Sequence, residues 1–283
     1  MWFYKIVNTV FMYYAFSMIQ LNFLVREEYI LQHALSSFTK EKNINTLKHK
    51  IWKYNHNLYY LLSGQLAVLL FQDISLSMMP NIVGHQARKN LQIILHSSQF
   101  QKVLHETKRY ADFVERQWTR NYDVAYTLVN EISRLPIQNR QINVFITHPK
   151  LFNGRSYPEL SVITWGHSED WKNYSTVYLW HEIMHHLIYT KKTDANLIHA
   201  LIELACDNEL RLRLNRKGRY FREGKYIVGH RNLINLEKYI LPHWKKYLAS
   251  KTNLLDFEKT LKNMLPKKML ANYNALDTWS DWH

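Results

Sequence analysis

Cysteine, glycine and proline are scarce in this chain of 283 residues, with one, seven and six copies respectively. A single cysteine excludes an internal disulfide framework and zinc fingers built from cysteine pairs, and it is typical of a reducing compartment. So few glycines and prolines predict few tight turns and much helix. Hydrophobic residues make up 47% of the chain and aromatic residues 14%, which indicates a folded core rather than disorder.

Acidic residues are also few, so the net charge is +14. Residues 211–268 hold sixteen Lys and Arg against four Asp and Glu, a net of +12. The charge of the basic segment 211–268 favours an anionic partner. An acidic protein, a nucleic acid and an anionic membrane all belong to this class. A solvated surface explains the same charges. The chain has no zinc-finger cysteines, glycine-rich phosphate loop or other recognised nucleic-acid motif, so charge alone favours that class of partner.

Residues 6–25 contain no charged side chain and are long enough to span a bilayer. Asn8 and Gln20 interrupt the run, and Tyr13 and Tyr14 stand at its centre rather than at its edges. We therefore favour a buried helix or strand pair over a membrane contact through 6–25. The expected location is cytoplasmic, with membrane association, or secretion without disulfides, left open.

Hydrophobic periodicity predicts an α+β fold that is mainly helical. Three regions are expected: a mainly helical region 1–135, a core 136–215, and a basic helical region 216–283. Helices are predicted at 98–134, with an interruption near Asn121 left open, at 231–249, kinked or broken at Pro242, and at 252–265. Strands are predicted at 141–147 and 159–165 because β-branched residues alternate there. Asn153-Gly154 reads as a turn, and the polar stretch 36–50 reads as a connection.

Residues 181–185 read His-Glu-Ile-Met-His, an H-E-x-x-H motif, within an apolar stretch that predicts a buried helix capped at Ser175 or Thr176. Residues four apart share one face of a helix, so His181 and His185 can direct two imidazole nitrogens at one point. Two neutral imidazoles form half of a zinc site, and Glu182 is placed to act as general base on a zinc-bound water.

A third metal ligand is needed, and the sequence offers more than one. A metzincin would have a third histidine six residues after His185, where this chain has Lys191. Glu203 lies on a predicted second helix with Asp207 four residues later on the same face. Glu203 can ligate the metal while Asp207 accepts a hydrogen bond from Nδ1 of a ligand histidine. His199 is the alternative third ligand.

The motif H-E-x-x-H, followed after seventeen residues by E-x-x-x-D, resembles the gluzincin clan of thermolysin-like zinc metallopeptidases. The resemblance covers roughly residues 140–215. It implies one zinc ion held by His181, His185 and Glu203, with Glu182 as general base and Asp207 behind a ligand histidine. It also implies a zincin-like core, made of a small sheet, an active-site helix and a glutamate helix. In such enzymes an edge strand before the metal helix binds extended substrate, a role this suggests for 160–165.

These observations predict a zinc metalloendopeptidase acting on a peptide or protein. No downstream motif identifies the group that stabilises the transition state; Tyr220, His230, Arg231 and His243 are the candidates, and His230 is our first choice. The alternative is a basic binding protein, associated with nucleic acid or membrane, that keeps a structural or inactive zinc site.

Overall fold

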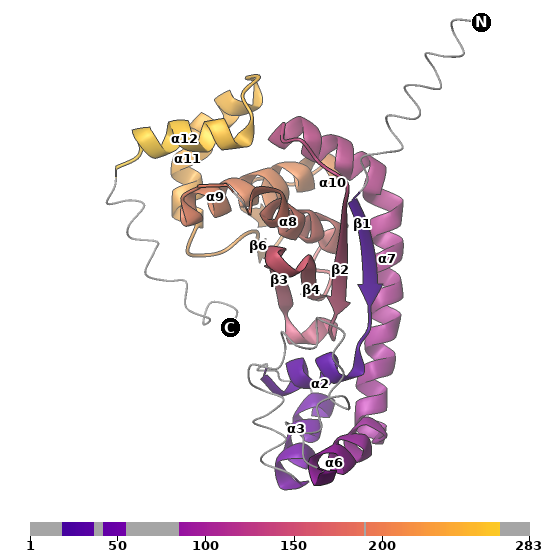
Figure 1. Cartoon of the computed structure of the whole chain (residues 1–283). Helices are drawn as coiled ribbons and strands as arrows, with labels where there is room; N and C mark the ends of the chain where they lie inside the picture. The colour runs from indigo at the N-terminus through magenta and orange to yellow at the C-terminus, as the bar shows by residue number, and fades with distance from the viewer. Residues whose placement is uncertain (1–18, 37–41, 55–84, 190, 267–283) are drawn as a thin grey trace, which may run out of the picture. The chain divides into compact units, whose positions relative to one another are not determined.

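The structure, a computed structural model, describes residues 19–36, 42–54, 85–189 and 191–266 (Figure 1). The described residues form a mixed α+β fold that is mainly helical, as the sequence predicts. The chain divides into two compact units. The first contains the described parts of Met1–Asn22, Trp118–Ile142 and Glu169–Asp281, and the second those of Phe23–Gln117 and Asn143–Ser168. Each unit draws on more than one of the three predicted regions.

The second unit is built from helices and most of a small sheet. Its helices are α2 (Glu27–Ser36), α3 (Lys42–Tyr54), α6 (His85–Leu95) and the first part of α7 (Ser98–Ser133). One hydrophobic cluster joins them, with Ile30, Ile44, Phe100 and Phe145 fully buried or nearly so. Helix α3 corrects the interpretation of 36–50 as a connection, because its apolar residues, such as Ile44 and Leu47, recur at helical spacing and enter this core.

Four strands form the sheet in the order β1-β2-β4-β3. Their bounds are β1 Ile19–Leu24, β2 Arg140–Ile146, β3 Asn153–Tyr157 and β4 Val162–Gly166. Strand β4 pairs parallel with β2 and antiparallel with β3. Two 3-10 turns, Pro149–Leu151 and Pro158–Leu160, lie before and after β3.

Two predictions about this sheet are wrong. Strand β4 lies between β2 and β3, so residues 160–165 are not an edge strand, and β3 occupies that edge instead. Asn153-Gly154 is the start of β3 rather than a turn. The chain reverses at Pro158–Leu160, where Ser161 takes a left-handed conformation with φ 52°.

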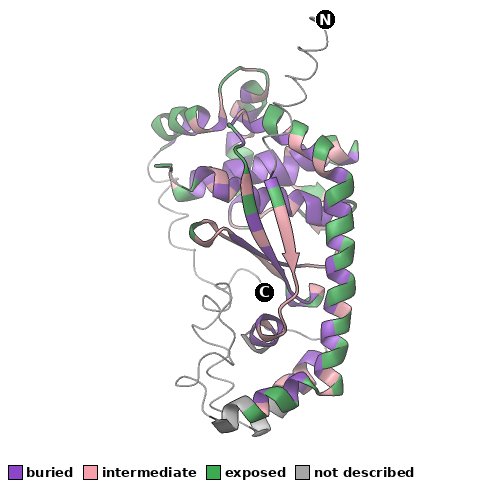
Figure 2. Ribbon diagram, turned by 45° about the vertical axis from the view of Figure 1, so that its right-hand side comes forward, coloured by how far each residue is buried: buried purple, intermediate pink, exposed green. Residues whose placement is uncertain are grey.

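Helix α7 is continuous from Ser98 to Ser133, so no interruption occurs near Asn121. Buried and exposed residues follow different faces of the helix, as Figure 2 shows. In the first unit, Asn121 Nδ2 donates to Asn173 Oδ1 and to Thr176 Oγ1, each at 3.0 Å. These two hydrogen bonds tie α7 to the start of the next helix, α8 (Tyr174–Ile188).

The rest of the first unit follows α8 along the chain. It comprises α9 (Ala195–Ile202), the π-helix η4 (Glu203–Leu210), α10 (Arg211–Asn215), the hairpin strands β5 (Arg222–Glu223) and β6 (Tyr226–Ile227), α11 (Ile234–Leu248) and α12 (Leu254–Met264). Helices α11 and α12 fall within the predicted ranges 231–249 and 252–265, and α11 continues through Pro242 without a break.

The beginning of α8 also differs from expectation. Asn173, in a left-handed conformation with φ 63°, precedes the first helical residue, so neither Ser175 nor Thr176 is the N-cap. Ser175 instead donates its backbone N–H to Glu169 Oε1 at 3.0 Å. The carboxylate of Glu169 thereby satisfies a donor that a capping side chain would otherwise take.

Of the uncharged stretch 6–25, residues 19–24 form strand β1, and residues 6–18 lie outside the described residues. Within the described residues no helix has the length and apolar character needed to cross a membrane.

Candidate metal centre

Helix α8 brings His181 and His185 together on one face, as the i, i+4 spacing predicts. Their Nε2 atoms lie 3.3 Å apart. The helix is buried on nearly every side, since it is packed among apolar residues such as Trp180 and Ile183. His181 is buried, and His185 is partly exposed.

Asp207 contacts Nδ1 of the His181 ring, the nitrogen that points away from His185. Its Oδ1 atom lies 2.9 Å from His181 Nδ1, and both side chains are buried. A carboxylate at this position fixes the tautomer with the proton on Nδ1, which leaves the lone pair of Nε2 directed at His185. This is the hydrogen bond that the sequence analysis expects; its role beside a metal stays a prediction.

The segment after α9 is a π-helix rather than the continuous α-helix expected from the sequence. Helix α9 begins after Asp194, whose side chain accepts from Leu197 N at 3.1 Å. From Glu203 to Leu210 the backbone widens into η4, which ends where Arg211 N donates to Cys206 O, five residues back. Such π segments are rare and are frequent at functional sites. Here the segment carries both Glu203 and Asp207.

Two further histidines surround Glu203. His199 Nε2 lies 3.6 Å from Glu203 Oε1. His230 donates its backbone N–H to Glu203 Oε2 at 2.9 Å, and its Nδ1 contacts Glu203 Oε1. The imidazole rings of His199 and His230 are 4.7 Å apart, and those of His185 and His199 are 5.0 Å apart.

The ligand atoms fall into two overlapping sets that could each hold a metal ion. His181, His185 and His199 form one, and His199, Glu203 and His230 form the other, with all atoms of a set within 4.8 Å of one another. The predicted ligands His181, His185 and Glu203 thus meet around His199 and do not form a set by themselves. His199, the alternative third ligand predicted from the sequence, is the residue that both sets share.

A closely packed polar shell holds the Glu203 carboxylate. Gly229 has φ +80°, and a Cβ atom there would lie 2.3 Å from Glu203 Oε2. Asn208 Nδ2 donates to the backbone oxygen of Glu203 at 3.1 Å and to Glu237 Oε2 at 3.2 Å. Glu237 is fully buried on α11 and lies beside Glu203. These contacts fix the direction in which Glu203 points.

Burial sets the charge states of the cluster. It lowers the pKa of His181 to about 3 and that of His185 and His199 well below the usual range, with the charge of His230 adding to the effect. Burial raises the pKa of Glu203 to about 8, and it raises the pKa of Asp207 against the opposing charges of His230 and Arg211. Neutral imidazoles are the form that binds metals.

The other site residues predicted from the sequence, Glu182 and the four candidates for transition-state stabilisation, lie in different surroundings. Glu182 is buried on α8. Burial raises the pKa of the Cys206 thiol, and the nearby charge of Glu182 adds to this effect. Among the four candidates for transition-state stabilisation, His230 is the one in contact with the cluster. The Tyr220 hydroxyl contacts Glu209, and Arg231 is exposed.

Glu237 and Asn208 are the residues that sequence reasoning missed. A signal for Glu237 exists, because it occupies the apolar stripe of α11 together with Leu236 and Ile240. An acidic residue at a core position of an amphipathic helix needs a polar partner inside the protein. The identity of that partner, Asn208, comes from the π-helix and was not accessible to a periodicity argument.

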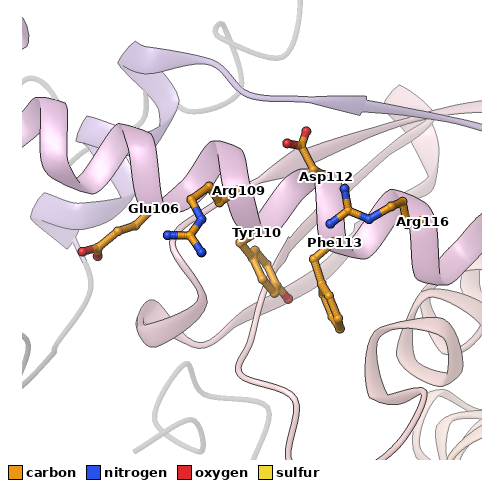
Figure 3. Close-up of a pocket in the computed structure, with 6 residues that line it drawn as sticks. All are labelled: Glu106, Arg109, Tyr110, Asp112, Phe113 and Arg116. Carbon is orange, nitrogen blue, oxygen red and sulfur yellow. The ribbon is translucent and has the colours of Figure 1, made fainter.

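A surface depression on α7, in the second unit, lacks the character of a substrate site. All its lining residues come from this one helix: Glu106, Arg109, Tyr110, Asp112, Phe113 and Arg116 (Figure 3). Ligand sites gather polar groups that converge from several elements, and a single helix face cannot supply them.

In the described part of the chain, the donors around His199 are thus a group that could hold a metal ion. They combine neutral imidazoles with a buried carboxyl group, from two successive helices and the segment before α11. Comparisons of the chain with protein families, with curated proteins and with solved structures find no match.

Proposed function

We propose that this chain is a zinc-dependent metallopeptidase whose first unit contains a zincin-like pair of helices, α8 and α9–η4. The observation that carries the proposal is the separation of 3.3 Å between His181 Nε2 and His185 Nε2. In a tetrahedral zinc site with bonds of about 2.0–2.1 Å, two ligand nitrogens lie about 3.3 Å apart. The two rings are therefore spaced as a zinc ion requires.

One buried polar atom at the cluster lacks a partner. His199 Nε2, which belongs to both candidate ligand sets, has no hydrogen-bond partner among the described residues. Buried polar atoms without partners are uncommon, and an ion that the structure does not contain is one explanation for them. The donor set of imidazole nitrogens and a carboxylate oxygen suits zinc.

The proposed ligands are His181, His185 and Glu203, with His199 as the alternative third ligand. When bound, zinc would polarise the peptide carbonyl group and make a water molecule more acidic. Glu182, next to His181, would accept the proton of the attacking water and deliver it to the leaving amine. His230, partly exposed beside Glu203, would donate a hydrogen bond to the oxyanion.

Metal analysis and one substitution test the proposal. Purified protein, prepared without chelator, should contain about one zinc ion per chain, as a single catalytic site requires. Glu182→Gln should keep that zinc and lose hydrolysis of a proteome-derived peptide mixture, because the amide cannot accept the proton. Glu159→Gln makes the same chemical change at an exposed position and should keep both zinc and activity.

Three results would contradict the function. Protein without zinc would remove both the catalytic and the structural zinc hypotheses. Full activity in Glu182→Gln would remove the general base. Zinc without any hydrolysis in the wild type would favour the alternative, a binding protein with an inactive zinc site.

A further inference from the structure

The segment between α10 and α11 is unusually rich in exposed positive charge. Residues 216–231, called here the basic hairpin segment, contain the strands β5 and β6 and six basic side chains against one acidic side chain, Glu223. All six are exposed: Arg216, Lys217, Arg219, Arg222, Lys225 and Arg231.

The acidic side chains next to these cations have other partners. Glu223 pairs with the buried guanidinium of Arg211. Glu209 accepts from Arg213 Nε at 2.7 Å and contacts the Tyr220 hydroxyl. Within the described residues, none of the six exposed cations forms an ion pair. Their charge is therefore available to a partner outside the chain.

The basic hairpin segment is attached directly to the candidate metal centre. Just before β5, Phe221 N donates to Asn208 Oδ1 at 2.7 Å, and near the end of the segment His230 N donates to Glu203 Oε2 at 2.9 Å. Both acceptors belong to η4. These two hydrogen bonds hold the basic hairpin segment against the π-helix that carries Glu203.

Solvent reaches the cluster on the side of this segment. The side chains of His199 and His230 are 29% and 23% exposed, whereas that of His181 is 3% exposed. A substrate that approaches the cluster must come from an exposed side. His230, one of these two exposed rings, is the penultimate residue of the basic hairpin segment, so this segment borders the approach.

The register of the hairpin decides which side chains face outward. Arg222 pairs with Ile227, and Glu223 pairs with Tyr226, around the turn Gly224-Lys225. Paired residues share one face of a hairpin, and successive residues alternate between faces. Because Glu223 turns inward to Arg211, the outward face carries Arg222 and Ile227, and Ile227 is 41% exposed.

We propose that the basic hairpin segment selects peptide substrates with acidic side chains close to the scissile bond. This inference rests on the proposed function and names its substrate class. A peptide is favoured over a nucleic acid or a membrane because the cations belong to the segment that enters the candidate peptidase site. An apolar side chain beside a cation also suits a polypeptide, which carries both kinds of group.

Binding to an inactive variant tests the proposal without hydrolysis. The protein is zinc-loaded full-length Glu182→Gln, and the probes are two fluorescent peptides that differ only in Asp and Glu against Asn and Gln. In fluorescence anisotropy the acidic peptide should bind about tenfold more tightly at low salt, and added salt should reduce the difference. Arg222→Glu with Lys225→Glu should abolish the preference.

The matched control reverses the same number of charges elsewhere. Lys245 and Lys246 are exposed on α11 outside the basic hairpin segment, and Lys245→Glu with Lys246→Glu should keep the preference. Circular dichroism checks that both variants fold, and Arg222→Gln with Lys225→Gln provides a milder version.

Three results would overturn the inference: equal binding of the two peptides, equal loss in the control, or tighter binding of duplex DNA or of phosphatidylserine vesicles than of the acidic peptide. Failure of the proposed function gives a different pattern. In that case wild type cleaves neither peptide, whereas the binding preference and its loss in Arg222→Glu with Lys225→Glu are still measured.

Discussion

Asp207 Oδ1 lies 2.9 Å from His181 Nδ1, and this contact joins the π-helix η4 to helix α8. Both side chains are buried, so water cannot replace either partner. The contact directs the opposite nitrogen of His181 at His185, which is the arrangement that a metal ligand needs. The metal affinity of the cluster should therefore depend on a residue that does not itself face the metal.

Replacing Asp207 with Ala should weaken zinc binding by about 10–100-fold, the usual effect of removing the hydrogen-bond partner of a ligand histidine. The His181 ring loses its orientation, and Nε2 becomes less basic. Competition with a chromophoric chelator measures the dissociation constant. Asp207→Asn keeps an oxygen that accepts from Nδ1, so its loss should be smaller. Equal losses in the two variants would show that the negative charge of Asp207, rather than the hydrogen bond that orients the ring, sets the zinc affinity.

Glu203 and His199 compete for the position of third ligand, and single substitutions separate them. If Glu203 is the third ligand and His199 does not replace it, Glu203→Ala should abolish measurable zinc binding at micromolar protein, because His181 and His185 alone leave the site incomplete. We expect His199→Ala to bind zinc with an affinity reduced by about tenfold at most. The same chelator competition provides the measurement. The reverse order would make the site a set of three histidines and would contradict the gluzincin resemblance.

Zinc binding should release about one proton at pH 7, and less as the pH rises beyond 8. The sign follows from burial, which raises the pKa of Glu203 to about 8. Below that pH the buried carboxyl group holds a proton that zinc must displace. His181, His185 and His199 contribute little, since burial lowers the pKa of each ring, that of His181 to about 3. Isothermal titration calorimetry in buffers of different ionisation enthalpy counts the protons.

Glu203→Gln is the control for this measurement, because an amide has no proton to give up. If the variant retains enough affinity for calorimetry, its proton release at pH 7 should fall towards zero. Release that stays the same between pH 7 and pH 9 in the wild type would show that the carboxyl group is already ionised before zinc arrives.

Short-range patterns predicted much of this fold. The spacing of apolar residues located α7, α11 and α12, and the i, i+4 spacing placed His181 and His185 side by side. Both depend on the period of a helix, which the sequence displays directly. The edge of the sheet was not predicted correctly, because strand order depends on long-range pairing. Asn153-Gly154 suits a turn locally, yet β3 begins there because β4 offers a partner.

In the candidate site, too, contacts close in sequence could be predicted and contacts distant in sequence could not. The arrangement of His181, His185 and Asp207 could be predicted from spacing, since one contact lies within α8 and the other joins α8 to η4. The central position of His199 could not be predicted in this way, because the second candidate ligand set also needs His230, which lies far along the chain. Glu237 and Gly229 come from segments later in the chain that the motif does not include.

Gly229→Ala should destabilise the protein and weaken zinc binding together. Gly229 has φ +80°, and the added Cβ would lie 2.3 Å from Glu203 Oε2. The left-handed backbone costs about 1–2 kcal/mol for a residue with a Cβ, and the overpacking adds about 1–3 kcal/mol. Urea unfolding with and without zinc measures the loss, and chelator competition measures the affinity.

Gly224 supplies the matched control for this substitution. It also has a positive φ, +57°, but an added Cβ meets no atom within 4 Å. Gly224→Ala should therefore cost only the backbone strain of about 1–2 kcal/mol, and its zinc affinity should equal that of the wild type. Because the two substitutions differ in their contact with Glu203, the difference between them isolates that contact. Equal affinities in both variants would mean that the position of the Glu203 carboxylate does not matter for the metal.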